Sequence, residues 1–345
     1  MSTRKSGNPV LPRAGEREQR DADQKARAAW LYYMEGMTQD KVAEKLEISR
    51  LRVLKLLAAS RQDGTVQIRV MSRLQECVRL ERQVEQTFGL QQAIVVPTPA
   101  EEERLPALIG SAAGNYLSDT LRSSMSVGLG WGQTLRHCLT SIPQQHIDGL
   151  TIVSLLGGLT RAAGVNPSEF AWRVADRLEA DCYMMTAPVF APDEETQQAL
   201  MSHPGIQEVT THACTLDLAL VSVGELAPGS TLMRLGLVTR DDLVSLARAG
   251  AVADVLCRFI DRDGRVVDHP LNRRVVAVDP RQLRGTPKLV LASGGWRKLD
   301  ALRAAIALLS PTVLITDQQA AEGLLAQRSA AAPDGVAELP VSPAR

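Results

Sequence analysis

The sequence predicts a small helix-turn-helix domain at the N-terminus, followed by a larger α/β domain with a largely parallel sheet. Three observations support this. The 345 residues exceed what one compact core usually holds. Residues 21–70 show helical patterns separated by short turns, whereas in residues 89–328 apolar strand patterns alternate with helical ones. Residues 1–73 hold 15 Lys or Arg and 9 Asp or Glu although the whole chain is neutral, which suggests a polyanion-binding module or an ordinary basic tail.

The composition excludes several classes of protein. Hydrophobic residues make up 45% of the chain and charged residues 23%, as in globular proteins. No stretch approaches the roughly 20 apolar residues that span a bilayer, and the first 20 residues contain no apolar run, so neither a membrane protein nor a signal peptide is expected. The five cysteines and five histidines lack metal-ligand or disulfide spacing, so we expect no metal, no cofactor and a cytoplasmic location.

Residues 21–70 are expected to form the helix-turn-helix domain. The expected elements, in chain order, are a helix at Asp23–Glu35, a helix at Gln39–Leu46 capped by Thr38, a helix at Arg50–Ser60 capped by Ser49, and a strand at Thr65–Val70. The expected inward side chains are Ala26, Ala29, Trp30 and Tyr33 in the first helix, Val42, Ala43 and Leu46 in the second, and Val53, Leu54 and Leu57 in the third.

The third of these helices has the features of a helix that reads DNA. Its outer face is basic, and residues 49–61 contain no acid. A helix fits the major groove, where Arg reaches phosphates or guanine edges, and Ser49 could donate to a phosphate. A three-helix interaction domain with a solvated basic face is the alternative. The residues expected to face DNA are Thr38, Gln39, Ser49, Arg50, Leu51, Arg52 and Lys55.

Three further segments lie outside the two folded domains. Residues 1–20 and 329–345 are polar and bury nothing, so we expect a disordered arm and a disordered tail. Residues 71–88 form an amphipathic helix that suits a linker or an oligomerisation coil between two copies, and packing of its stripe on its own domain is an equal alternative. The stripe consists of Leu74, Cys77, Leu80, Val84 and Phe88.

Strands and helices alternate through residues 89–328. The expected strands are Gln92–Val96, Ser126–Gly130, Leu150–Leu155, Leu218–Val223, Lys288–Ala292 and Val313–Thr316. The expected helices include Leu105–Leu121, Pro167–Leu178, Arg240–Ala249 and Lys298–Leu309. Ligands of parallel α/β sheets bind beyond the carboxyl ends of the strands, so the loops at those ends are the candidate site.

Glycine-rich turns follow three of these strands. Glycine lets backbone N–H groups approach an anion, and Lys298 adds a charge that could meet a phosphate. Asp254 lies among small apolar residues, where it could accept hydrogen bonds from sugar hydroxyls or serve as a helix cap or ion-pair partner. Arg234 and Arg173 are candidate anion ligands or surface residues. The expected ligand-binding residues are Gly130, Trp131, Gly132, Gln133, Thr134, Gly157, Gly158, Arg234, Asp254, Gly294, Gly295 and Lys298.

Six segments in this order resemble the SorC (sorbose-operon regulator) family of bacterial transcription factors. They are MTQDKVAEKLEISRLRVLKLLAASRQDGTVQI, SVGLGWGQTL, LLGG, GAVADVLCRFIDRDG, LASGGWRKLDALRAAI and VLITD. The resemblance covers about residues 22–325. It implies a DNA-binding module joined to a Rossmann-like effector domain similar in fold to sugar-phosphate isomerases and deaminases. It also implies an assembly that is usually tetrameric and controls a carbohydrate or polyol operon.

The resemblance also implies residue roles. The loop from Gly130 to Thr134 and the Gly157-Gly158 pair would line the effector pocket, Asp254 would bind hydroxyls and Lys298 would bind phosphate. Arg50, Arg52 and Lys55 would face DNA. The sequence departs from the family pattern in two places: Ala253 stands where glycine is common, and Leu51-Arg52 replaces a small polar pair.

We therefore expect a cytoplasmic transcriptional regulator that is not an enzyme. Its expected partners are double-stranded operator DNA, a phosphorylated sugar or polyol, and further copies of itself in a dimer or tetramer, with no membrane. The first alternative is a sugar-phosphate isomerase or deaminase with a DNA-binding appendage. Asp119, Asp254 and Asp317 would be its candidate bases, but no acid–histidine pair is evident in the loops. The second is a structural protein that dimerises through residues 72–88.

Overall fold

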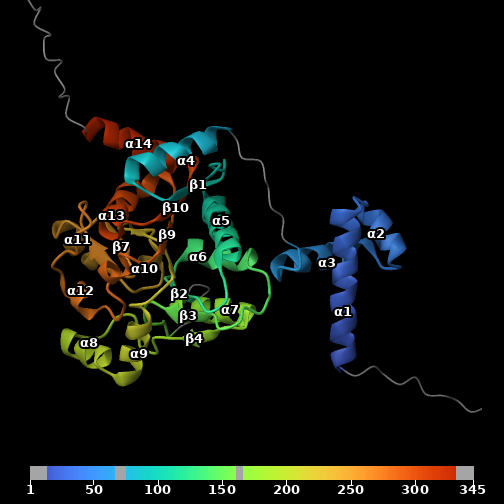
Figure 1. The fold of residues 1–345 in the computed structure, drawn as a ribbon, viewed down its shortest axis with the longest axis horizontal. Helices are drawn as coiled ribbons and strands as arrows, with labels where there is room; N and C mark the ends of the chain where they lie inside the picture. Colours follow the sequence, from blue (N-terminus) through green and yellow to red (C-terminus); the bar gives the residue numbers. More distant parts are fainter. Residues whose placement is uncertain (1–13, 67–74, 161–165, 332–345) are drawn as a thin grey trace, which may run out of the picture. The chain divides into compact units, whose positions relative to one another are not determined.

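The computed structural model describes residues 14–66, 75–160 and 166–331. The chain forms two compact units, residues 1–70 and residues 71–345 (Figure 1). This boundary coincides with the end of the expected helix-turn-helix domain. None of the described helices is long and apolar enough to cross a membrane.

The N-terminal unit is helical. Its elements are α1 (Ala14–Ala29), the π-helix η1 (Trp30–Met34), α2 (Gln39–Lys45) and α3 (Arg50–Gln62). Thr38 and Ser49 cap α2 and α3 as predicted, because their hydroxyl oxygens accept the amide N–H groups of Lys41 and Arg52 at 3.3 and 3.2 Å. The short turn between the two helices contains Glu47 in the left-handed region, with φ of 54°. The helix, turn, helix arrangement is confirmed.

The first helix differs from the prediction in its start and in its inward face. It begins at Ala14, so residues 14–20 are helical and were wrongly assigned to a disordered arm, while residues 1–13 lie outside the described part. Its core side chains are Ala28, Ala29 and Leu31, whereas Trp30 is 59% exposed. Of the four predicted inward residues, Ala29 is buried and Tyr33 packs against the core, whereas Ala26 and Trp30 are exposed, so the prediction placed part of the stripe on the solvent side of the helix.

Helix α3 also buries one leucine other than the one expected. Val53, Leu56 and Leu57 lie in the core, and Leu54 is 41% exposed. The buried stripe follows the i, i+3, i+4 spacing of one helical face from Val53, which excludes Leu54. Residues 67–70 of the predicted strand lie outside the described residues, and Thr65 and Val66 form a bend.

The larger unit contains a seven-stranded sheet in which every neighbouring pair is parallel. In spatial order its strands are β1 (Gln92–Val96), β10 (Val313–Asp317), β9 (Lys288–Ala292), β5 (Leu218–Val221), β2 (Ser126–Leu129), β3 (Thr151–Ser154) and β4 (Asp181–Tyr183). All six expected strands are confirmed, with ends shifted by at most two residues. Strand β4 was not predicted, because three residues are too few to show a pattern.

Helices cover both faces of the sheet (Figure 1). One face packs against α5 (Leu105–Thr120) and α7 (Pro167–Leu178). The other packs against α13 (Leu299–Leu309) and α14 (Gln318–Ala331), of which residues 329–331 extend into the expected tail. Central strands are therefore apolar on both sides, as in other doubly wound parallel sheets. The tail residues 332–345 lie outside the described part.

Helix α4 (Gln75–Phe88) packs on its own unit, which is one of the two alternatives given for this segment. Its side chains Cys77, Leu80 and Val84 are buried in the core beside β1. The carboxylates of Glu85 and Glu81 accept the outward amide N–H groups of Ala93 and Val95 at 2.8 and 3.1 Å. The apolar stripe is thus used within the unit, as the second alternative expected; Leu74 lies outside the described residues.

A second sheet was not anticipated. It is antiparallel and contains β6 (Gly224–Glu225), β7 (Ala253–Val255) and β8 (Arg258–Ile260). The two-residue turn Leu256-Cys257 has both residues at positive φ, 50° and 64°, as a tight hairpin of this kind requires. Neither residue is glycine, so the usual sequence signal of such a turn is missing.

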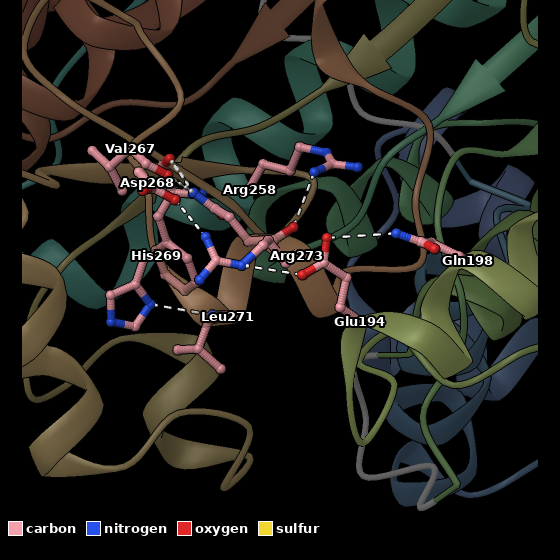
Figure 2. Close-up of polar contacts among 10 residues, drawn as sticks. Glu194, Gln198, Arg258, Val267, Asp268, His269, Leu271 and Arg273 are labelled. Atoms are coloured by element: carbon pink, nitrogen blue, oxygen red, sulfur yellow. Dashed lines mark hydrogen bonds and ion pairs between the residues drawn. The ribbon is translucent and has the colours of Figure 1, made fainter.

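Short helices complete this unit. They are α6 (Gln133–Arg136), α8 (Glu194–Met201), α9 (Pro204–His212), α10 (Thr231–Arg234), α11 (Arg240–Arg248) and α12 (Pro270–Arg274), with 3-10 turns η2 (Glu102–Arg104), η3 (His137–Thr140), η4 (Pro280–Leu283) and η5 (Trp296–Lys298). Figure 2 shows how α12 is tied to α8: the Arg273 guanidinium pairs with Asp268 and, at 3.3 Å, with Glu194. His269 caps α12 by accepting the amide N–H of Leu271 at 3.2 Å.

Candidate functional site

A cavity of about 400 Å³ opens beyond the carboxyl ends of β2 and β5. After β2 the chain adds β3 and β4 toward one border of the sheet, and after β5 it adds strands toward the other border. The two strands therefore flank the point at which the strand order reverses. Open α/β sheets bind ligands at this point, because the loops on either side diverge and leave a crevice.

The first wall of the cavity is the turn after β2. Trp131, Gly132, Gln133 and Thr134 line it. Gly132 has φ of 127°, a backbone conformation that other residues rarely adopt. The sequence prediction placed these four residues at a ligand site, and the structure brings them together at one cavity.

Asp254 also lines the cavity. It lies in β7, is 7% exposed, and accepts the amide N–H of Cys257 at 3.2 Å through one carboxylate oxygen. Burial raises its pKa to about 6, while the Cys257 hydrogen bond and the charge of Lys298 lower it. A Cβ at Gly224 would lie 2.0 Å from the other carboxylate oxygen, so a glycine at position 224 leaves room for Asp254. Asp254 belongs to a strand and is not a helix cap.

Positive charge lies beside this carboxylate. The Lys298 ammonium, half-buried at the end of η5, donates to the Val223 carbonyl at 3.5 Å. Burial lowers the pKa of Lys298, Glu225 and Asp254 raise it, and Arg234 lowers it further. Arg234 is exposed at the cavity wall and hydrogen-bonds the Thr231 hydroxyl at 3.3 Å. The cavity therefore combines two cations with buried acceptor groups.

The turn after β9 lines a smaller, adjoining cavity of about 130 Å³. Gly294 and Gly295 contribute to its wall, and Lys298 and Thr134 line both cavities. Asp317 holds the turn, because its carboxylate accepts the Gly295 amide N–H at 2.7 Å and the Thr98 hydroxyl at 2.6 Å. Asp317, one of the candidate bases of the alternative enzyme reading, is fully buried and positions this turn.

Three predicted glycines do not line either cavity. Gly130 closes β2, where its amide N–H donates to Leu220 and an added Cβ would lie 3.2 Å from Leu256. An added Cβ at Gly157 would lie 2.5 Å from the Ala187 carbonyl oxygen, and the amide N–H of Gly158 donates to the same oxygen. These glycines permit close packing of chain segments. Arg173, a further anion candidate, pairs with Glu169 at 3.4 Å on α7.

The sequence prediction missed much of the lining. The missed residues include Glu103, Pro106, His137, Ser222, Val223, Gly224, Glu225, Gly229, Ser230, Thr231, Leu232 and Leu256. The Gly229-Ser230 pair before α10 offered a turn-and-cap signal. His137 was not among the expected site residues, but it lies on the cavity wall, where burial and the neighbouring Arg136 lower its pKa.

The N-terminal unit places its predicted DNA-facing residues around the start of α3. Arg50, Leu51, Arg52 and Lys55 are exposed on its first two turns. Arg50 pairs with Asp40 of α2 at 3.6 Å, and Arg52 pairs with Asp21 of α1 at 2.6 Å. Thr38 is exposed and Gln39 is half-buried at the start of α2, where the Thr38 hydroxyl is engaged as a cap, as is that of Ser49.

Comparison with known proteins agrees with this organisation. Residues 72–326 match the family model described as "Putative sugar-binding domain". The erythritol catabolism regulatory protein EryD of Brucella abortus is 30% identical to this chain, over 87% of the chain and 96% of its own length. The transcriptional regulator LsrR of Klebsiella pneumoniae is also 30% identical, over 88% and 93%.

Two solved structures share the fold. The full-length sorbitol operon regulator SorC from Klebsiella pneumoniae aligns with a TM-score of 0.66 at 24% identity, covering 89% of this chain and 99% of its own. A DeoR family transcriptional regulator from Listeria monocytogenes aligns with a TM-score of 0.67 at 27% identity, covering 72% and 99%. Together with these relatives, the family match defines a transcriptional regulator with a sugar-binding domain. The chain belongs to the SorC family of these regulators.

Proposed function

We propose that this regulator controls a carbohydrate or polyol catabolic operon, and that a phosphorylated sugar or polyol in the cavity sets its affinity for operator DNA. The observation that carries the proposal is the presence of Asp254 and Lys298 in one cavity. Relatives named for erythritol catabolism and for deoxyribonucleosides support the same class of effector.

The hydroxyl groups of such an effector need hydrogen-bond acceptors, and its phosphate needs positive charge. The cavity offers both. Carboxylates accept hydrogen bonds from hydroxyl groups, and Asp254, Glu225 and Glu103 line the walls. An ammonium group binds a phosphate through charge-assisted hydrogen bonds, and Lys298 and Arg234 supply positive charge. A ligand that carried carboxylates in place of hydroxyls would be repelled by the three acids.

The effector would act by shifting the populations of the regulator's conformations. It would bind one arrangement of the regulator better than another and thereby change how the DNA-reading helices meet the operator. Since one helix-turn-helix domain reads only a short sequence, we propose a homo-oligomer, a dimer or a tetramer, acting in the cytoplasm. Size-exclusion chromatography with light scattering measures this directly, and a monomer at micromolar concentration would contradict it.

The role of the cavity is tested by a thermal-shift screen of sugar and polyol phosphates together with their unphosphorylated counterparts. A ligand at about one hundred times its Kd stabilises the folded state by about 2.7 kcal/mol, so one phosphorylated compound should clearly raise Tm. Lys298→Ala should abolish that rise while the operator complex forms as before. Lys288→Ala, at the opposite end of β9, should keep the rise and is the matched control.

Two results would contradict the proposal. A rise in Tm that survives in the Lys298→Ala protein would show that the phosphate binds elsewhere, and equal stabilisation by unphosphorylated compounds would show that no phosphate is recognised. The regulator is also proposed to bind its effector without converting it. Incubation with ketose and aldose phosphates, followed by product analysis, would reveal turnover if the cavity were an enzyme site.

A further inference from the structure

The exposed side of α3 contains an apolar pair. Leu51 is 64% exposed and Leu54 is 41% exposed, although the helix already buries Val53, Leu56 and Leu57 in the core of its unit. Residues three apart lie on the same side of a helix, so the two leucines form one small apolar surface. Single exposed apolar residues are ordinary, but here two neighbours occupy the first turns of the helix that is expected to read DNA.

Cations surround this surface. Successive residues of a helix are about 100° apart, so Arg50 and Arg52 lie on either side of Leu51, and Lys55 follows it one turn later. All three cations are exposed, and residues 49–61 contain no acid. This charge complements a polyanion, and it favours the major groove of DNA over an apolar surface of a protein as the occupant.

The two arginines are held to the sides by their own unit. Arg50 pairs with Asp40 of α2, and Arg52 pairs with Asp21 of α1. Both pairs are solvent-exposed and therefore weak, so the arginines remain available to phosphates that flank the helix. The position between them, which would face the floor of the groove, holds a side chain without any donor or acceptor.

We propose that Leu51 reads the 5-methyl group of a thymine in the operator and that Leu54 extends this contact. The thymine methyl is the apolar group on the base edges of the major groove, and apolar side chains recognise it by contact. The inference rests on the proposed binding of operator DNA, and it adds a specific base at one position of each half-site.

The experiment removes the methyl group alone. The operator is first located by footprinting upstream fragments, and each thymine is then replaced in turn by deoxyuridine, which lacks only the methyl group. Affinities are measured by fluorescence anisotropy at one fixed salt concentration. At one thymine, removal of the methyl group should raise the Kd of the wild-type protein about fourfold per half-site, the effect expected for burial of one methyl group. Replacement of the other thymines should change Kd little.

Leu51→Ala completes the test. This variant should bind the thymine operator more weakly than wild type and should no longer distinguish thymine from deoxyuridine at that position. Leu108→Ala, which removes a 41% exposed leucine from the larger unit, should keep the full wild-type pattern. Circular dichroism melting curves establish that both variants are folded.

Each outcome decides whether the leucines contact a thymine, contact a second copy of the chain, or belong to a protein that does not bind an operator. If the wild-type protein tolerates deoxyuridine at every position, or if Leu51→Ala stays as sensitive as wild type, the inference is wrong although operator binding stands. If Leu51→Ala instead changes the oligomeric state in light scattering and weakens binding to all DNA equally, the leucines contact a second copy of the chain. If no upstream fragment binds in preference to random DNA, the proposed function itself fails.

Discussion

Asp254 is the residue at which the proposed recognition of the effector conflicts with stability. Its carboxyl group has a pKa of about 6 in the folded protein, against an ordinary value of 3.8, because burial disfavours the charged form. Between pH 3.8 and about pH 6 this carboxyl group loses its proton in the unfolded chain but keeps it in the folded protein, so the stability falls as pH rises. Above pH 6 the full penalty is present, and below pH 3.8 it vanishes. At neutral pH it is at most about 3 kcal/mol.

Asp254→Asn should therefore stabilise the free protein at pH 7.5 by up to about 3 kcal/mol, since an amide oxygen can still accept the Cys257 N–H. The gain over wild type should shrink as the pH approaches 4, and the Tm rise caused by the effector should fall sharply. Thermal melts of both proteins across this pH range test the prediction. A variant that is less stable than wild type at pH 7.5 would contradict the assignment.

Among the elements, α4 and β1 show how side chains satisfy the amide N–H groups at the border of a parallel sheet. The amide N–H groups of Ala93 and Val95 point away from the neighbouring strand β10 and would lack partners beneath the helix. Glu85 and Glu81 of α4 accept them. A buried amide without a partner costs about 1–3 kcal/mol, so these two carboxylates contribute to the stability of the whole unit.

Glu85→Ala should lower the free energy of unfolding of the larger unit by about 1–3 kcal/mol, because the Ala93 amide N–H loses its acceptor. Glu85→Gln keeps an oxygen acceptor and should lose less. Urea denaturation followed by tryptophan fluorescence compares the two variants. Equal losses would show that charge, rather than the hydrogen bond, is what matters at this position.

The sequence predicted the elements that have a strong local pattern and missed those that depend on distant contacts. Buried parallel strands appear as continuous apolar runs, so β1 and β9 were placed residue for residue. The small sheet has strands of two or three residues and a turn without glycine, so no local signal marks it. The fit between Gly224 and Asp254 joins positions thirty residues apart, which only the folded chain reveals.

The residues of the candidate site were also predictable only where a local sequence pattern marks them. A strand, glycines and a helix start predicted Trp131 to Thr134 and Lys298, and all of them line the cavity. The same rule failed for Gly157, because glycine also serves where two backbones pack closely. Glu225 and His137 carried no motif at all, since the cavity recruits them through the packing of separate loops.

For the whole molecule, DNA binding should be dominated by charge. Lys and Arg displace counterions from the phosphates, so log Kd should change linearly with log salt. Lys55→Ala should weaken binding to specific and random DNA by a similar factor and reduce the salt slope by about 1. Anisotropy titrations between 50 and 200 mM salt, as a rough range in which such slopes are measured, test this. An unchanged slope would place Lys55 away from the phosphates.

The carboxylates of α4 have a consequence for how copies of this chain can associate. A sheet border with vacant amide donors invites another chain to continue the ladder, and aggregation often begins in this way. Here Glu81 and Glu85 already occupy two of those donors on β1. That border is closed to strand addition, so a second copy has to associate through other surfaces.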